Sequence, residues 1–175
     1  MNYSKKSILL SIIFVLLALF SSGPAFSQKN DQVVLIHVKN LKTEKELTLQ
    51  AIVATSLAAL NQSNRVVIFF DAGAVKAIKI GRWYGGDTTI LDKVDIKGEQ
   101  HKKLSGELNI SQASTPSNYG DLFRLLRGKG IALYVSKPII EELELDDEHY
   151  DTAFDPIDYE KIMEMISSAD VYLSY

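Results

Sequence analysis

Three side chains that can take part in acid–base or nucleophilic chemistry lie close to the ends of predicted strands. His37 lies near the end of an apolar stretch, Asp71 directly follows a second such stretch, and Ser136 directly follows a third. The carboxyl ends of parallel strands meet at one edge of a sheet, where α/β proteins usually bind their ligands. We therefore expect His37, Asp71 and Ser136 to meet at this carboxyl edge. There they would form either an enzyme site, as base, orienting group and nucleophile, or the lining of a small-ligand carrier.

The sequence around Ser136 also supports a purely structural role. Pro138 suits the first turn of a helix, and serine is favoured at the position before a helix. No nucleophile-elbow motif surrounds Ser136. We expect Ser136 to end the strand 131–135 and to cap or lead into the helix begun by Pro138, or to be the remnant of a lost cysteine. A hydrogen bond to a ligand and catalysis are the alternatives. For His37, the simplest expectation is a strand histidine whose ring is hydrogen-bonded to a neighbour.

Three further residues are candidates for ligand binding: Lys137, Gly73 and Trp83. Lys137 lies beside a predicted helix N-terminus, where a cation helps to hold a small anion, although a solvent-facing lysine is the simpler interpretation. Gly73 also fits a turn, and Trp83 also fits packing of a loop against the domain. The acidic run 141–148 lacks the ligand spacing and the glycine of a calcium loop, so we expect a solvated face and no metal site. Nothing in the sequence indicates a cofactor.

The first 27 residues have the pattern of an export signal. Two lysines precede an apolar run over 8–20, and small residues at 25 and 27 match the positions that a signal peptidase reads. The run of about 13 residues is short of the roughly 20 that span a bilayer. We expect a signal peptide over 1–27 and a periplasmic or secreted protein with no membrane contact after cleavage. An uncleaved signal anchor is the alternative.

Composition narrows the possible functions of the remainder, 28–175. Removal of residues 1–27 takes away two of the 19 Lys and Arg residues and none of the 22 Asp and Glu residues, so the formal charge falls from −3 to −5. This acidic balance gives no reason to expect nucleic acid as a partner. The chain has no cysteine, which excludes disulfides, thiol nucleophiles, persulfides and thiolate metal sites. The length suits a single domain with its own core.

The hydrophobic pattern predicts alternating strands and helices. Unbroken apolar stretches predict buried strands at 33–38, 65–70, 131–135 and 171–174, and 151–154 is a candidate minor strand. Helical spacing predicts helices at 44–60, 118–127, 138–143 and 158–168. Residues 83–117 lack strong periodicity, so we expect an irregular insertion or lid there. The predicted fold is a three-layer α/β/α domain with a mostly parallel sheet of four or five strands.

Four pieces of the sequence together resemble the DsrE/DsrF-like family, which shares its fold with YchN-like proteins. They are the opening strand with its alanine-rich helix, "VVIFFDAGAVKAI" at 66–78, "LFRLLRGKGIALYVSKPI" at 122–139 and "SSADVYLSY" at 167–175. The resemblance covers about 32–175 and is poor over 83–117. It implies a DsrE-like fold and assembly into homo-oligomers, trimers or hexamers.

One departure from the family changes the expected function. In sulfur-relay members a cysteine after the third of these strands carries a persulfide, and Ser136 stands at that place here. A hydroxyl cannot hold a sulfane sulfur, so persulfide transfer is not expected. We expect an exported, DsrE-like, non-enzymatic binding or assembly module that self-associates. The alternative is a small-ligand carrier or enzyme that uses the carboxyl edge around His37, Asp71 and Ser136.

Overall fold

The computed structural model describes residues 31–41, 45–81 and 88–175. Five strands form one sheet: β1 (Val33–Val38), β2 (Arg65–Phe70), β3 (Ala132–Ser136), β4 (Asp155–Ile157) and β5 (Val171–Ser174). Their order across the sheet is β4-β3-β2-β1-β5, and every neighbouring pair is parallel. The helices are α2 (Lys45–Asn61), α3 (Gly98–Leu108), α4 (Tyr119–Gly128), α5 (Lys137–Glu142) and α6 (Tyr159–Ser168). The predicted three-layer α/β fold with a parallel sheet is confirmed.

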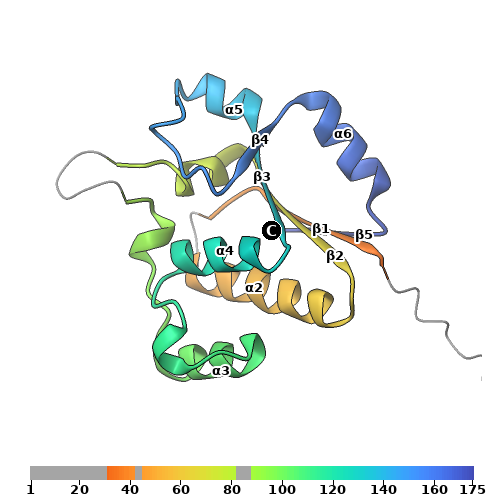
Figure 1. Cartoon of the computed structure of the whole chain (residues 1–175). Helices are drawn as coiled ribbons and strands as arrows, with labels where there is room; N and C mark the ends of the chain where they lie inside the picture. Colours follow the sequence, from red (N-terminus) through yellow and green to blue (C-terminus); the bar gives the residue numbers. More distant parts are fainter. Residues whose placement is uncertain (1–30, 42–44, 82–87) are drawn as a thin grey trace, which may run out of the picture.

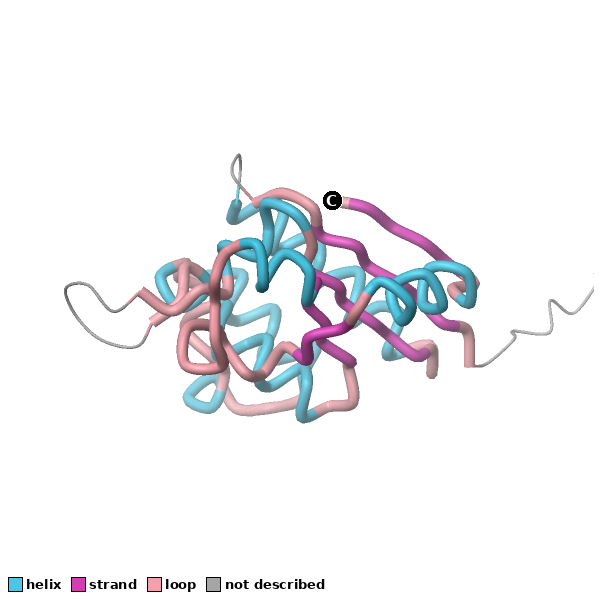
Figure 2. The backbone as a smooth tube through the Cα atoms, turned by 90° about the horizontal axis from the view of Figure 1, so that it is seen from above, coloured by secondary structure: helices cyan, strands magenta, loops and turns pink. Residues whose placement is uncertain are grey.

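The order of the strands decides which helix covers which face. The chain moves in one direction across the sheet from β1 through β2 to β3, and right-handed crossovers therefore place α2 and α4 on the same face. The step from β4 back to β5 runs in the opposite direction and places α6 on the other face. Figure 1 shows α2 and α4 on one side of the sheet and α6 on the other, and Figure 2 shows the five strands from above.

The core consists of two separate clusters because alternate residues of each strand point to opposite faces. Val34, Ile36 and Val38 of β1 belong to the larger cluster on the side of α2 and α4. Leu35 of β1 belongs to the smaller cluster, which includes Ile162 and Met165 of α6. The unbroken apolar sequence of β1 is thus explained by burial on both faces.

Residues 88–117 are more ordered than the sequence pattern predicts. The expectation of an irregular segment is wrong for α3, which has 11 residues and buries Leu104 and Leu108 against the main core. The remaining residues of α3 are polar or glycine. The hydrophobic pattern that could have predicted this helix therefore consists of one pair only, Leu104 and Leu108 at i and i+4. Its end is marked by Asn109, whose φ of 54° is left-handed, a conformation that asparagine tolerates.

The predicted minor strand is displaced along the chain. Residues 151–154 form a turn, in which the Asp151 carboxylate accepts a hydrogen bond from the Ala153 amide at 2.9 Å. The strand itself, β4, follows at Asp155–Ile157 and lies at the edge of the sheet. An edge position suits Pro156, which has no amide hydrogen to donate to a neighbouring strand.

Arg124 of α4 joins three segments that are distant in the sequence. Its guanidinium lies 2.9 Å from carboxylate oxygens of both Asp92 and Asp121 and 2.7 Å from an oxygen of Asp151. Burial by itself would raise the pKa of Asp92, but hydrogen bonds from Arg124 and Thr89 lower it below its ordinary value. Asp92 therefore stays ionised, and its ion pair with Arg124 ties the segment around Asp92 to α4.

Gly120, in the first turn of α4, makes this close approach possible. A Cβ at this position would lie 2.8 Å from the Asp92 carboxyl carbon, closer than real Cβ contacts allow. We predict that Gly120→Ala lowers the free energy of unfolding by about 1–3 kcal/mol, the usual cost of overpacking. Gly106→Ala is the matched control, because a Cβ there meets nothing within 4 Å. Urea unfolding should show the control unchanged or more stable, and equal effects in both variants would contradict the packing argument.

Candidate functional site

His37 is a buried polar residue at the carboxyl end of β1. Its exposed fraction is 5%, and its ring packs on Phe69 of β2 with ring centroids 4.8 Å apart. The parallel register pairs His37 with Phe69 on one side and with Ser174 of β5 on the other. Because it lies on the same side of β1 as Leu35, the ring faces the α6 side of the sheet.

Both ring nitrogens of His37 are hydrogen-bonded to side chains from neighbouring strands. Nε2 lies 3.1 Å from Oδ2 of Asp71, which follows β2, and Nδ1 lies 2.7 Å from the hydroxyl of Tyr172 in β5. An ionised carboxylate only accepts hydrogen bonds, so Nε2 carries the proton and donates it to Asp71. Nδ1 is then an acceptor, and the Tyr172 hydroxyl donates to it. We call this arrangement the Asp71–His37–Tyr172 triad.

The environment of His37 favours the neutral imidazole. Burial lowers its pKa below the ordinary value of 6.5, and the hydrogen bond and charge of Asp71 oppose this only in part. The charge of Lys39, directly after β1, lowers the pKa further. Neutral His37 is therefore the form that holds the Tyr172 hydroxyl near pH 7.

The predicted meeting of His37 and Asp71 is present, but Ser136 does not join them. Ser136 is buried at the end of β3, and β2 separates β3 from β1. Neighbouring strands lie about 4.8 Å apart, so the two-strand step leaves Ser136 beyond hydrogen-bond reach of the His37 ring. A Ser136–His37–Asp71 constellation is therefore not formed.

Ser136 has the predicted position before a helix, without a side-chain capping hydrogen bond. Ser136 occupies the N-cap position of α5 as expected, yet its side chain makes no capping hydrogen bond. A cap hydroxyl accepts from the second or third amide of the helix, and Pro138, at the second position, has no amide hydrogen. Ser136 therefore ends β3 and leads into α5, as one form of the expectation requires, and Pro138 removes one of the donors that a hydrogen-bonded cap would use.

Two of the other sequence candidates, Lys137 and Gly73, lie in the described residues, and neither is a member of the triad. Lys137 is more than half exposed and lies 3.8 Å from Glu141 on its own helix, in keeping with the solvent-facing interpretation. Gly73 lines a small cavity of about 250 Å³ together with Leu41, Lys45 and Lys76. Trp83 lies outside the described residues.

Sequence reasoning missed Tyr172, the third member of the triad. Its side chain is 43% exposed, whereas His37 behind it is buried. Tyr172 could have been found only from the strand order, because nothing in the sequence shows that β5 is the neighbour of β1. The alternation of β5 then places Tyr172 on the same face as His37.

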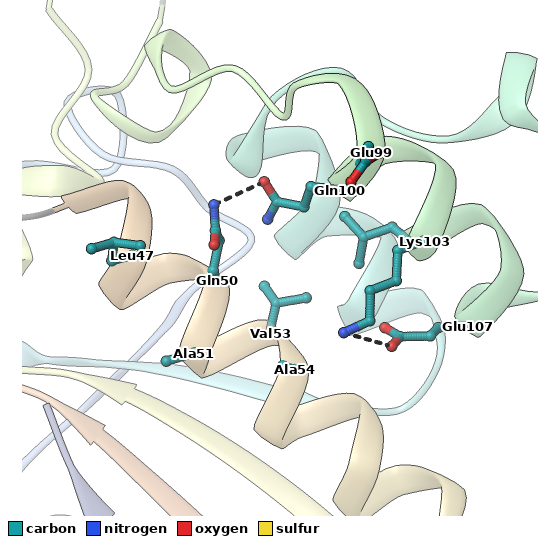
Figure 3. A pocket seen from close by; sticks show the side chains of 10 residues that line it. Leu47, Gln50, Ala51, Val53, Ala54, Glu99, Gln100, Lys103 and Glu107 are labelled. Atoms are coloured by element: carbon teal, nitrogen blue, oxygen red, sulfur yellow. Dashed lines mark hydrogen bonds and ion pairs between the residues drawn. The ribbon is translucent and has the colours of Figure 1, made fainter.

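Sequence reasoning also missed a groove between α2 and α3. It has a volume of about 550 Å³, with Leu47, Ala51, Val53 and Ala54 of α2 on one side. Figure 3 shows Val53 and Ala54 on the side of α2 that faces Gln100 and Lys103 of α3. A hydrogen bond of 3.1 Å from Gln50 to Gln100 closes one end. None of the groove residues belongs to the triad.

The part of the chain that the structure describes contains neither a candidate metal site nor a membrane-spanning helix. Within it, no group of three or more His, Asp or Glu residues is placed to hold a metal ion. No described helix has both the length and the apolar character needed to cross a membrane. No protein-family model matches the sequence, and no curated protein matches it either.

The lowered pKa of His37 predicts how stability depends on pH. The unfolded histidine binds a proton below its ordinary pKa of about 6.5, whereas the folded one resists protonation to a lower pH. The stabilisation from neutral His37 is therefore complete above pH 6.5 and is lost as the pH falls towards the folded pKa. Urea unfolding at pH 7.5, 6 and 5 should show a smaller loss of stability in His37→Gln than in wild type. An equal loss of stability in wild type and in His37→Gln would contradict the lowered pKa of His37.

Proposed function

We propose that this chain is an exported, non-enzymatic assembly module of DsrE-like fold that associates with copies of itself. The observation that carries the proposal is the outer surface of α6. Tyr159 and Met163 are 71% and 62% exposed and lie one helical turn apart, at i and i+4, so their side chains are neighbours. An adjacent exposed aromatic and methionine are typical of the centre of a protein–protein interface.

The position of α6 in the fold supports this choice of surface. Among the described residues, α6 is the helix that packs on its face of the sheet, and it does so through Ile162 and Met165. The apolar side chains on its outer surface are therefore not needed for the core of the monomer. A second copy of the chain is the partner that we propose, as the family resemblance implies for trimers or hexamers.

The polar site gives less support to an enzyme. Both ring nitrogens of His37 are already bonded within the protein, and Ser136 is buried. Persulfide transfer is not part of the proposal, because the sequence has no cysteine. A second candidate is small-ligand binding at the carboxyl edge, favoured by the 3.1 Å contact between His37 and Asp71 and by the exposed Tyr172 beside them.

We predict that Met163→Glu weakens self-association at least tenfold. A charge at this position would have to be desolvated in the interface, and a loss of about 1.4 kcal/mol corresponds to a factor of ten. Leu47→Glu is the matched control, since Leu47 is an equally exposed apolar residue (59%) on the opposite side of the sheet. Native mass spectrometry and light scattering over a concentration series would measure subunit number and dissociation constant.

Two outcomes of this experiment would overturn the proposed function. One is a wild-type protein that remains monomeric at every concentration. The other is a wild-type oligomer that Met163→Glu leaves intact and Leu47→Glu dissociates, which would move the interface to the groove between α2 and α3.

A further inference from the structure

The Tyr172 hydroxyl lies where a buried base meets solvent. The side chain is 43% exposed on the edge strand β5, and its oxygen is 2.7 Å from Nδ1 of His37. The proton that Tyr172 donates in this bond is directed into the protein. The oxygen keeps its lone pairs, and they are available to a group that approaches from outside.

The distances match those of an activated nucleophile. Such a group needs a base within about 2.6–3.2 Å, and the base must in turn be oriented by a third group. The Tyr172 hydroxyl oxygen lies 2.7 Å from Nδ1 of His37, and Nε2 of His37 lies 3.1 Å from Oδ2 of Asp71. The three residues come from three adjacent segments of one parallel sheet, so the backbone register fixes their spacing.

We propose that Tyr172 is an activated phenol and a site of covalent acylation, with His37 as its base and Asp71 as the positioning residue for His37. The ligand class is a small electrophilic acyl donor, such as an activated ester or an acyl-imidazole. This inference builds on the second candidate function, the carboxyl edge, and does not depend on self-association. It assigns a modification site and not a turnover cycle.

The proposed step is balanced without any further reactant. The Tyr172 oxygen attacks the carbonyl carbon of the donor while its proton passes to Nδ1 of His37. The bond from the carbonyl carbon to the leaving group then breaks, and the leaving group takes the proton from His37. The products are an aryl ester on Tyr172, the protonated leaving group and a neutral histidine.

The charged groups around His37 favour this direction of proton transfer. Asp71 is hydrogen-bonded to the opposite side of the ring and stabilises the imidazolium that forms, whereas Lys39 opposes it. Burial keeps the ring neutral beforehand, since it lowers the pKa of His37. At neutral pH, His37 is therefore unprotonated on Nδ1 and able to accept the proton of Tyr172.

Other tyrosines in the described residues lack this arrangement and serve as internal controls. Tyr159 is 71% exposed, more than Tyr172, but it has no histidine partner among the described residues. Tyr150 donates its proton to Asp147, and burial together with this carboxylate raises the pKa of Tyr150 to about 12. Exposure alone therefore predicts that Tyr159 reacts faster than Tyr172, whereas activation by His37 predicts that Tyr172 reacts faster.

The test is acetylation of the purified protein with N-acetylimidazole at pH 7.5. Rates are followed at each tyrosine by peptide mass spectrometry, and release by hydroxylamine separates phenol esters from lysine amides. We expect Tyr172 to react at least fivefold faster than Tyr159 in wild type. His37→Gln should abolish this advantage and leave the rate at Tyr159 unchanged. Asp71→Asn should reduce it. Because the pKa of His37 in the folded protein is lowered, the rate at Tyr172 should stay high at pH 6.5 and fall only at a lower pH, where His37 takes up a proton.

The result in wild type alone can overturn the inference, so it stays testable if a variant fails to fold. Tyr172 reacting no faster than Tyr159 would contradict it, as would a His37→Gln variant that folds and keeps the Tyr172 advantage. Native mass spectrometry of Met163→Glu and Leu47→Glu measures subunit number, which does not depend on the acetylation rate at Tyr172. Failure of one proposal is therefore distinguishable from failure of the other.

Discussion

The parallel pairing of β1 on both sides is the constraint on which the rest of the structure depends. Its backbone joins β2 through the bond of 2.9 Å from the Asp71 amide to the Val38 carbonyl, and joins β5 through bonds with Tyr175. A shift of either neighbour by one residue would turn its side chains to the opposite face. The Asp71–His37–Tyr172 triad therefore exists only in the observed register, with β1 between the strands that supply Asp71 and Tyr172.

The same topology gives the two faces of the sheet different sets of side chains. The face under α2 and α4 carries the larger core, which takes in the segment around Leu91 and the helix α3 as well. The opposite face carries a small core under α6, the triad, and the exposed side chains of Tyr159 and Met163 on α6. The larger core thus lies on one side of the sheet, and the triad lies on the other.

The sequence predicted those parts of the fold that have a strong local signal. The strands 33–38 and 65–70 have the predicted bounds, and α6 begins one residue after its predicted start, because Asp158 caps it. α3 escaped prediction because only Leu104 and Leu108 mark its buried side. Local patterns were sufficient wherever apolar residues recur over several turns, and insufficient for a largely polar helix.

The site was predictable only in part, for a different physical reason. His37 and Asp71 lie at the ends of two consecutive strands of one βαβ unit, so their proximity follows from handedness and parallel pairing. Tyr172 is 135 residues from His37, and the two meet because β5 is added beside β1 and not beside β4. Ser136 occupies the position before α5, and its missing side-chain bond follows from Pro138, the second residue of α5, which lacks the amide hydrogen.

The state of the His37 ring tests the central claim, the triad itself, most directly. A two-dimensional ¹H–¹⁵N correlation spectrum of the imidazole at neutral pH distinguishes a protonated Nε2 from a protonated Nδ1. The account predicts a neutral ring with the proton on Nε2, and Nδ1 shifts that change in Tyr172→Phe. A ring protonated on Nδ1, or one that Tyr172→Phe leaves unchanged, would contradict it.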